Sequence, residues 1–278
     1  MSGLRLDLGC GATKKEGTIG LDVVPGPVVD QVLNFETDPL PFPDGSVEYV
    51  FSSHCLEHLP GPFPLFTEIS RVCQEGAGLE FWTPYAWENS AFIFGHRTFY
   101  NEDHYLHACL WFADYWQKLL GKRWVLREIV YVIEPSVLAE LFREQVNLDF
   151  ALRYYKGIVR EFGVMIDVWG NYPGPEIQPE RRFAANREAE RHPLPPIAYP
   201  PAEIPPDELA KATAWLSASS VERPLARREP VAPPGQRPRL ALARHLASRF
   251  RVVAREEGLL AVARRTGGYL RGWVKPLF

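Results

Sequence analysis

The chain is short of cysteine, and its few cysteines do not form a metal or redox motif. They stand at positions 10, 55, 73 and 109, so no two of them make a Cys-x-x-Cys pair. No secretory leader precedes them, because Met1 leads directly into a strand-like run. A reducing compartment fits this pattern best, and we predict a cytoplasmic protein.

Long apolar runs and an excess of one charge are also absent. No stretch reaches 18 consecutive apolar residues, so no segment is predicted to span a membrane. The net charge of -3 does not favour nucleic acid as a partner. The charge is unevenly distributed, however. Residues 237–278 carry a local charge of +8, whereas residues 1–236 carry -11.

Short apolar runs bounded by Gly, Pro or Asp predict a series of β-strands. They cover residues 4–8, 18–22, 28–33, 47–52 and 78–83. A helix is predicted over residues 64–75, because its apolar residues recur at helical spacing and Glu75-Gly76 is a good helix stop. Strands joined by crossovers form a mostly parallel sheet whose strands are buried.

The second half of the chain divides into an insertion, the end of the sheet and two tails. The insertion, rich in aromatic residues and histidine, covers residues 85–120 and ends in a predicted helix. A strand at 125–133, a helix at 134–146 and a last strand at 158–169 follow, after which we expect the sheet to be complete. Residues 173–238 hold 15 of the 26 prolines, which is typical of an extended or wrapping segment. The predicted parts are a domain at 1–170, a Pro-rich arm at 171–238 and a basic helical segment at 239–278.

A glycine turn follows the first predicted strand, in Asp7-Leu8-Gly9-Cys10-Gly11. Glycine lets the backbone approach a ligand closely and leaves amide groups pointing at it. Asp22 comes fifteen residues after Asp7, at the end of the second strand, where a carboxylate can accept both hydroxyls of a ribose. Together these features predict a nucleoside site at the switch point of a doubly wound sheet.

Several ordered segments within residues 3–84 resemble the class I S-adenosylmethionine-dependent methyltransferases. They are DLGCG, GLD, DPLPFPDGSVEYVFSSHCLEHL and EISRVCQEGAGLEFWTP, and they are most similar to a short branch associated with polysaccharide and natural-product pathways. The resemblance implies an α/β fold: a Rossmann-like doubly wound sheet, mostly parallel with an antiparallel last strand. Here a Pro-rich arm and a C-terminal helix would follow it. The implied cofactor is S-adenosylmethionine.

The resemblance also assigns the cofactor site residue by residue. The glycine turn would face the methionyl group, and the acid after the second strand would bind the ribose. Residues after the third strand would border the adenine, and those after the fourth would close the site. The implied cofactor-binding residues are Asp7, Gly9, Cys10, Gly11, Asp22, Val23, Asn34, Phe35 and Ser53.

The chain departs from the usual pattern in one place. Only residues 12–17 separate the glycine turn from the second strand, too few for a crossover helix, although the resembled branch shares this shortening. We therefore expect a barer cofactor face that another segment must cover, with the Pro-rich stretch as the candidate. A nicotinamide dehydrogenase is disfavoured, because Lys14 occupies its third glycine position and no helix fits there.

The stretch SSHCLEHLP, residues 52–60, contains His-x-x-Glu-His, a pattern by which zinc peptidases bind their metal. We reject a peptidase because the pattern begins at the end of the fourth strand, on the rim where such sheets bind ligands, and not inside a helix. Three interpretations stay open. Glu57 and His58 brace the following helix, an imidazole removes a proton from an acceptor hydroxyl, or His54, Glu57 and His58 hold a divalent ion with a ligand from the insertion. Methyl transfer needs no metal, and we predict none.

Three histidines lie in the insertion, at positions 96, 104 and 107, beside Glu102 and Asp103. Histidines among aromatic residues are commonly interior hydrogen-bonding groups. The resembled class, however, builds its acceptor pocket after the fifth strand. In the related branch a histidine stands twelve residues before the aromatic residue that closes the following helix, and His104 and Trp116 have that spacing. The candidate catalytic residues are therefore His104, His58, His54 and Glu57.

These features predict methyl transfer from S-adenosylmethionine to a small-molecule or glycan acceptor, at a hydroxyl. The alternative is a non-catalytic cofactor-binding module within a biosynthetic assembly. The C-terminal segment also has two interpretations. Its apolar stripe packs on the core, or the basic helix makes a peripheral contact with an anionic membrane, since Leu242, Leu246 and Phe250 fall near one face. The oligomeric state is not predicted.

Overall fold

The computed structural model describes residues 3–197 and 204–222. The chain divides into two units, residues 1–200 and 201–278, which are considered separately. The described part of the second unit is a helix, α6 (Pro206–Glu222), which the Pro-rich composition of this region did not predict. The predicted basic helix at residues 239–278, with its proposed membrane contact, lies outside the described residues.

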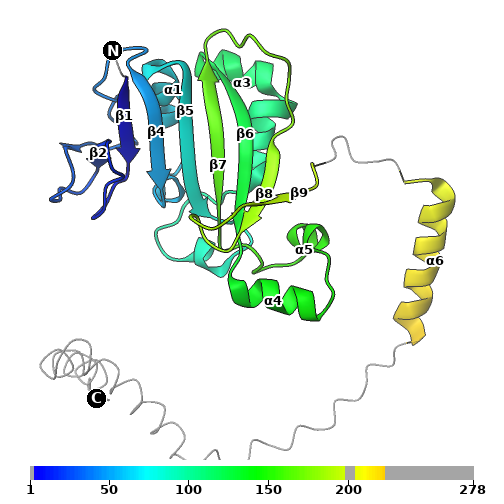
Figure 1. Ribbon diagram of the computed structural model, residues 1–278. Coiled ribbons are helices and arrows are strands. Elements are labelled where there is room, and N and C mark those ends of the chain that lie inside the picture. Colours follow the sequence, from blue (N-terminus) through cyan, green and yellow to red (C-terminus); the bar gives the residue numbers. More distant parts are fainter. Residues whose placement is uncertain (1–2, 198–203, 223–278) are drawn as a thin grey trace, which may run out of the picture. The chain divides into compact units, whose positions relative to one another are not determined.

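The first unit is built on one nine-stranded sheet (Figure 1). The strand order is β3-β2-β1-β4-β5-β7-β6-β8-β9. The strands are β1 (Leu4–Leu8), β2 (Ile19–Asp22), β3 (Gln31–Val32), β4 (Val47–Ser53), β5 (Cys73–Pro84), β6 (Arg123–Val132), β7 (Glu161–Trp169), β8 (Glu180–Ala184) and β9 (His192–Leu194).

The strand directions confirm the predicted Rossmann-like arrangement. Strands β3, β2, β1, β4 and β5 are mutually parallel, and β7 is antiparallel to both β5 and β6. We had expected the sheet to be complete with β7, but it contains two further strands. Strand β8 pairs in parallel with β6, and β9 pairs antiparallel with β8, so residues 180–194 of the predicted arm are part of the sheet. Proline within β9 is tolerated because this strand lies at the edge.

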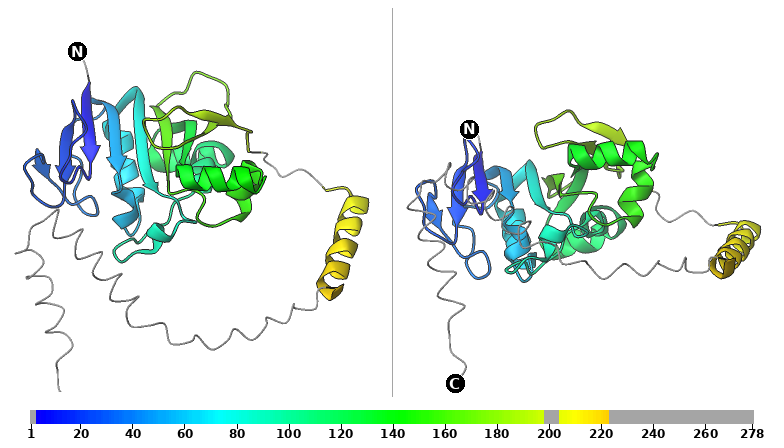
Figure 2. Two further views of the ribbon diagram at one scale, coloured as in Figure 1. Left: turned by 60° about the horizontal axis from the view of Figure 1, so that its bottom comes forward. Right: turned by 90° about the horizontal axis from the view of Figure 1, so that it is seen from below.

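Helices cover one face of this sheet and border one end of it. Helix α1 (Phe63–Val72) and helix α3 (Ala113–Leu120) lie behind the strands in Figure 1. The insertion forms the short η2 (Asn89–Phe92), α2 (Glu102–Leu106) and a π-helical turn η3 (His107–Trp111) before α3. Helices α4 (Pro135–Arg143) and α5 (Leu148–Tyr154) lie beyond the carboxyl end of β6 (Figure 2). Helix α1 ends at Val72, earlier than predicted, because β5 already begins at Cys73.

The two faces of the sheet have opposite character, because side chains alternate along each strand. The helix-covered face carries the apolar core, in which Leu6, Leu8 and Phe81 are at most 1% exposed. The other face carries Asp7, Glu80 and other polar side chains, and no crossover helix links β1 to β2 to cover them. The expectation of buried strands is therefore met on the helix-covered face, whereas on the other face Arg5 of β1 is exposed and Tyr49 and Phe51 of β4 are only partly buried. No helix within the described residues is long and apolar enough to cross a membrane.

Candidate functional site

The glycine turn after β1 is shaped by packing against the end of β4. Gly9 has a φ of 73°, and a Cβ there would lie 2.4 Å from the Cβ of Cys55, so a larger residue does not fit. The N–H groups of Gly9 and Cys10 both donate to the Leu21 carbonyl, at 2.8 and 3.2 Å. The expectation that the turn's amides point at a ligand was therefore wrong, because β2 already accepts them. Gly11 has a φ of 55° and faces open space.

Asp22, at the end of β2, holds the same turn in place. Its Oδ2 accepts the Gly11 N–H at 2.9 Å, and its Oδ1 accepts the Val24 N–H at 2.9 Å. Each carboxylate oxygen has a second lone pair, so Asp22 can still accept a hydroxyl. The first role of this side chain is to join the glycine turn to the loop after β2.

A polar cavity of about 450 Å³ opens on the uncovered face of the sheet, beside the glycine turn. It contains both acidic and basic side chains, together with the Trp82 ring. Its lining residues are Asp7, Gly9, Cys10, Thr13, Lys14, Lys15, Phe51, Ser53, Glu80, Trp82, Arg187, Glu188 and Arg191. Four of the predicted cofactor residues, namely Asp7, Gly9, Cys10 and Ser53, are therefore brought together here.

Lys15 and Glu80 form the floor of this cavity. Lys15 Nζ donates to Glu80 Oε2 at 2.6 Å and to Tyr49 Oη at 2.7 Å. Trp82 Nε1 donates to the other oxygen of Glu80 at 2.7 Å. Burial by itself would raise the pKa of Glu80, but these hydrogen bonds outweigh it and hold that pKa below its usual value. We did not predict this network, and the only signal for it was a charged residue within the otherwise apolar run GLEFWT.

Arg187, between β8 and β9, lies over the same cavity. It donates to Ser53 Oγ at 2.9 Å and to Glu161 Oε2 at 2.6 Å, and its guanidinium stacks 4.7 Å from the centre of the Trp82 ring. This segment belongs to the stretch that we expected to cover the bare face. No motif marked Arg187 itself, because its partners lie more than 20 residues away in the chain.

His54 follows β4 directly and has a left-handed backbone, with a φ of 51°. Its Nε2 lies 2.8 Å from Glu161 Oε2, and its Nδ1 lies 3.3 Å from Glu57 Oε1. The hydrogen bond to Glu161, aided by Glu57, raises the pKa of His54 to about 9. A protonated imidazole cannot accept another proton, so this environment argues against His54 as a base at neutral pH. His54 borders a separate open cavity of about 620 Å³.

Glu57 and His58 lie in a short 3-10 turn, η1 (Leu56–His58), as the end of β4 predicted. Glu57 is 2% exposed, whereas His58 is exposed. The insertion packs onto this turn, because the N–H groups of Arg97 and Thr98 both donate to the Glu57 carbonyl, at 2.7 and 3.1 Å. His96 is thereby brought beside His58, with 4.8 Å between the ring centres.

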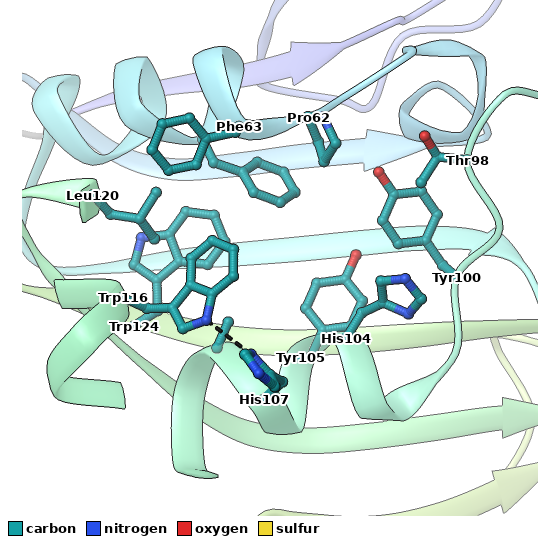
Figure 3. A pocket seen from close by; sticks show the side chains of 12 residues that line it. Pro62, Phe63, Thr98, Tyr100, His104, Tyr105, His107, Trp116, Leu120 and Trp124 are labelled. Atoms are coloured by element: carbon teal, nitrogen blue, oxygen red, sulfur yellow. Dashed lines mark hydrogen bonds between the residues drawn. The ribbon is translucent and has the colours of Figure 1, made fainter. Parts of the chain in front are cut away.

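A second cavity of about 280 Å³ lies on the helix-covered side of the sheet, and its walls are mainly aromatic (Figure 3). It is enclosed by the start of α1, the insertion and the start of β6. Its lining residues are Pro62, Phe63, Phe66, Thr98, Tyr100, His104, Tyr105, His107, Ala108, Trp116, Leu120 and Trp124. The predicted catalytic residue His104 is therefore in a cavity, whereas Glu57 and His58 do not line this one.

The remaining predicted cofactor residues lie in the loops after β2 and β3. Val23 is exposed, and the side chain of Asn34 accepts the Glu36 N–H at 3.0 Å. Phe35 is 7% exposed and packs in the apolar core. The structure does not place these three residues in the polar cavity.

The methyltransferase domain family matches residues 6–80, which include the glycine turn, Asp22 and the whole of β4. The chain therefore contains a methyltransferase domain, consistent with a class I S-adenosylmethionine-dependent enzyme. No protein of curated function matches it.

Solved structures similar to this methyltransferase have low sequence identity to it. A SAM-dependent methyltransferase from Archaeoglobus fulgidus is 16% identical, with a TM-score of 0.43, over 59% of this chain and 86% of that one. Geranyl diphosphate C-methyltransferase from Streptomyces coelicolor is 16% identical, with a TM-score of 0.39, over 60% and 71%. The [4+2]-cyclase SpnF is 17% identical, with a TM-score of 0.39, over 60% and 74%.

The residues around the glycine turn fit the cofactor of this class. Gly11 leaves open space where a Cβ would otherwise project, so a ligand can approach the backbone closely. The adjoining cavity presents Asp7 and Glu188 as well as Lys14 and Arg187. Charges of both signs suit the ammonium and the carboxylate of a methionyl group.

Proposed function

We propose that the methyltransferase binds S-adenosylmethionine between the polar cavity and the loop after β2. Gly9, Cys10 and Ser53 would border the methionyl end, and Asp22 would accept the ribose hydroxyls. The adenine would then lie toward Asn34 and the backbone of Phe35, since the Phe35 side chain is in the core. The open backbone at Gly11, next to a cavity with both signs of charge, is the observation that supports this arrangement.

The acceptor is proposed to be a hydroxyl-bearing small molecule or a sugar, held in the aromatic cavity. Trp116, Trp124 and Phe63 offer flat apolar surfaces, and His104 and His107 place polar groups among them (Figure 3). Cavities of this kind, mostly apolar with a few polar groups that fix orientation, are typical of small-molecule sites. The segment from His54 to Pro62 connects the cofactor side to this cavity.

Hydrogen bonds assign opposite roles to the two histidines of the cavity. His104 Nδ1 lies 2.8 Å from Asn101 Oδ1 and 3.4 Å from the Asn101 backbone nitrogen. The shorter contact favours a proton on Nδ1, which leaves Nε2 as an acceptor. Trp116 Nε1 donates to His107 Nδ1 at 2.9 Å, which makes His107 Nε2 a donor. Burial lowers the pKa of His104, so its imidazole is neutral at pH 7. His104 is therefore the proposed base for the acceptor hydroxyl, and His107 would orient the same group.

The protein's contribution to the reaction is alignment and proton acceptance. The bound cofactor supplies an electrophilic methyl group, and the acceptor oxygen must approach it in line. His104 Nε2 would take the hydroxyl proton as the oxygen attacks, and the aromatic walls would exclude competing water. The observation that supports this proposal most is the neutral imidazole of His104 in a mainly aromatic cavity.

Product analysis tests this function directly. The enzyme is incubated with S-adenosylmethionine carrying a deuterated methyl group and a panel of glycans and hydroxylated pathway intermediates. Mass spectrometry should show one labelled methyl on oxygen in at least one acceptor. His104→Asn should abolish that product, whereas His192→Asn, which removes an exposed imidazole on β9, should not.

A non-catalytic cofactor-binding module is the alternative. It would bind S-adenosylmethionine with the same affinity in wild type and His104→Asn, yet transfer no methyl group to any acceptor of the panel. Methylation of carbon or nitrogen would instead preserve the enzyme class and overturn the hydroxyl acceptor.

A further inference from the structure

Two imidazoles and a carboxylate meet where the insertion packs on the turn after β4. Glu57, His58 and His96 each offer a ligand atom, and these atoms lie within 4.8 Å of one another. The residues come from two segments that are separated by more than 35 positions. Their approach is set by the main chain, because loop residues 97 and 98 both donate their N–H groups to the Glu57 carbonyl.

Contacts with backbone carbonyls fix the tautomer of both imidazoles. His58 Nδ1 lies 3.2 Å from the Gly95 carbonyl, and His96 Nδ1 lies 3.1 Å from the Ala91 carbonyl. A carbonyl oxygen only accepts, so each Nδ1 must carry the proton. Both Nε2 atoms are then left with a lone pair. Metal-binding histidines typically donate their other nitrogen to a backbone carbonyl in this way.

Glu57 is buried without the hydrogen bonds that a buried carboxylate needs. Its side chain is 2% exposed, and neither Oε1 nor Oε2 has a hydrogen-bond partner among the described residues. Its nearest basic group is His54, whose Nδ1 is 3.3 Å from Oε1, but His54 makes its shorter contact with Glu161. His54 thus offers Glu57 one ionic contact, at Oε1, and Oε2 has no partner among the described residues, so the carboxylate can accept a further cation.

We propose that Glu57, His58 and His96 bind a divalent transition-metal ion. An equilateral triangle with a 4.8 Å edge puts its centre about 2.8 Å from each corner, against about 2.1 Å for a Zn–N bond. Each ligand atom therefore has to move inward by less than about 1 Å, which small side-chain rotations provide. The sequence left open a set of His54, Glu57 and His58 with one ligand from the insertion. His96 is that insertion ligand, and His54 is not part of the cluster.

The donor set indicates the class of ion. Two imidazole nitrogens and one carboxylate oxygen suit Zn²⁺, Mn²⁺ or Fe²⁺, whereas Mg²⁺ and Ca²⁺ prefer oxygen ligands alone. His58 is exposed and His96 is partly exposed, so solvent reaches the ion on that side. Three protein ligands with an open position are typical of sites that also bind water or a ligand oxygen.

The site adjoins the wall of the aromatic cavity. Burial, and then the charge of Glu57, raises the pKa of Tyr100, whereas burial is the main cause of the raised pKa of Tyr105. Both tyrosines line the cavity, and Tyr100 Oη donates to the carbonyl of Leu56 beside Glu57. An ion here would fasten the insertion, which builds the acceptor cavity, to the turn that follows β4. This role does not depend on which acceptor is methylated.

Metal titration of the full chain tests the proposal. After treatment with a chelator and its removal, calorimetry with Zn²⁺ should show one tight site per chain, and Mg²⁺ should bind far more weakly. His96→Asn and His58→Asn should each lower the Zn²⁺ affinity by at least about tenfold. Asparagine keeps an N–H for the backbone carbonyl while removing the ligand nitrogen, so these variants are expected to fold. The matched control, His192→Asn, should bind Zn²⁺ as wild type does.

A second measurement identifies the ligands independently of affinity. Co²⁺ bound to wild type should give a visible absorption spectrum that changes in His96→Asn and in Glu57→Gln. Zn²⁺ should also raise the melting temperature of wild type and not that of His96→Asn. The proposal fails if wild type binds no Zn²⁺ at micromolar concentration, or if both histidine variants bind it unchanged. Preference for Mg²⁺ over Zn²⁺ would overturn the class of ion.

Discussion

Arg187 Nη1 donates a hydrogen bond of 2.9 Å to Ser53 Oγ, and the two residues are 134 positions apart. Ser53 ends β4 beside the polar cavity, and Arg187 belongs to the segment between β8 and β9. The same guanidinium binds Glu161, which also binds His54. A late segment of the chain thus completes a site whose other parts lie within the first 84 residues.

Replacing Arg187 with lysine should weaken cofactor binding. Lysine keeps the positive charge but cannot bridge Ser53 and Glu161 together or stack flat on Trp82. We expect a loss of about tenfold in the affinity for S-adenosylmethionine, measured by calorimetry, which corresponds to about 1.4 kcal/mol. Arg143→Lys is the control, because Arg143 on α4 is exposed, pairs with Glu140 and does not line the cavity. Equal losses in both variants would contradict a specific role for Arg187.

Asp22→Asn should reduce the same affinity more strongly. The carboxylate both accepts the Gly11 N–H and would bind the ribose, and a charge-assisted hydrogen bond contributes about 1.5–3 kcal/mol. The expected effect is therefore about tenfold to a hundredfold in the dissociation constant. Asp44→Asn removes an exposed carboxylate that pairs with Arg71 and should leave the cofactor affinity unchanged. Unchanged affinity in Asp22→Asn would overturn the ribose assignment.

Gly9→Ala should destabilise the fold, because the added Cβ meets Cys55 at 2.4 Å in a backbone conformation with a φ of 73°. The conformational strain alone is about 1–3 kcal/mol, and the contact adds to it. Gly45→Ala provides the comparison, since its φ is 65° and nothing lies within 4 Å of the added atom. Urea unfolding should show a larger decrease in the free energy of unfolding for Gly9→Ala. Equal decreases would show that the Cys55 contact has no energetic consequence.

The acid limb of the pH–rate profile should lie below pH 6.5. Burial lowers the pKa of His104, and the imidazole acts as a base only when it is neutral, so kcat/KM should rise with pH through that lowered pKa and then level off. The profile is measured with an accepted substrate over pH 4.5–8. His192→Asn should keep this limb. An acid limb above pH 6.5 would show that another group is the base.

Much of the structure of residues 3–84 could be predicted from the sequence because its signals are local. The run LRLDL followed by GCG predicted both β1 and the turn, and the polar end of β4 predicted where His54, Glu57 and His58 would lie. The insertion was less predictable. Its helix is divided into α2, a π-helical turn and α3, which the single apolar periodicity of residues 108–120 did not reveal.

Long-range contacts account for what the sequence analysis missed. Residues 180–194 look like part of a proline-rich arm, yet β8 pairs with β6 because the open edge of the sheet offers unpaired backbone groups. Lys15 and Glu80 are 65 positions apart, and their ion pair exists only because β1, β4 and β5 are neighbours in the sheet. The free amides expected at the glycine turn are bound by Leu21, which a pattern of glycines cannot indicate.

The sequence by itself determined the fold class, the positions of the first five strands along the chain and the presence of a glycine turn with an acid after β2. Each of these depends on residues close together in the chain, where side-chain period and backbone freedom act directly. Only the tertiary structure decided which side chains share a cavity, which tautomer each histidine adopts, and that His96 joins Glu57 and His58. Those outcomes depend on contacts between segments that the chain brings together only when the apolar face of the sheet is buried by its helices.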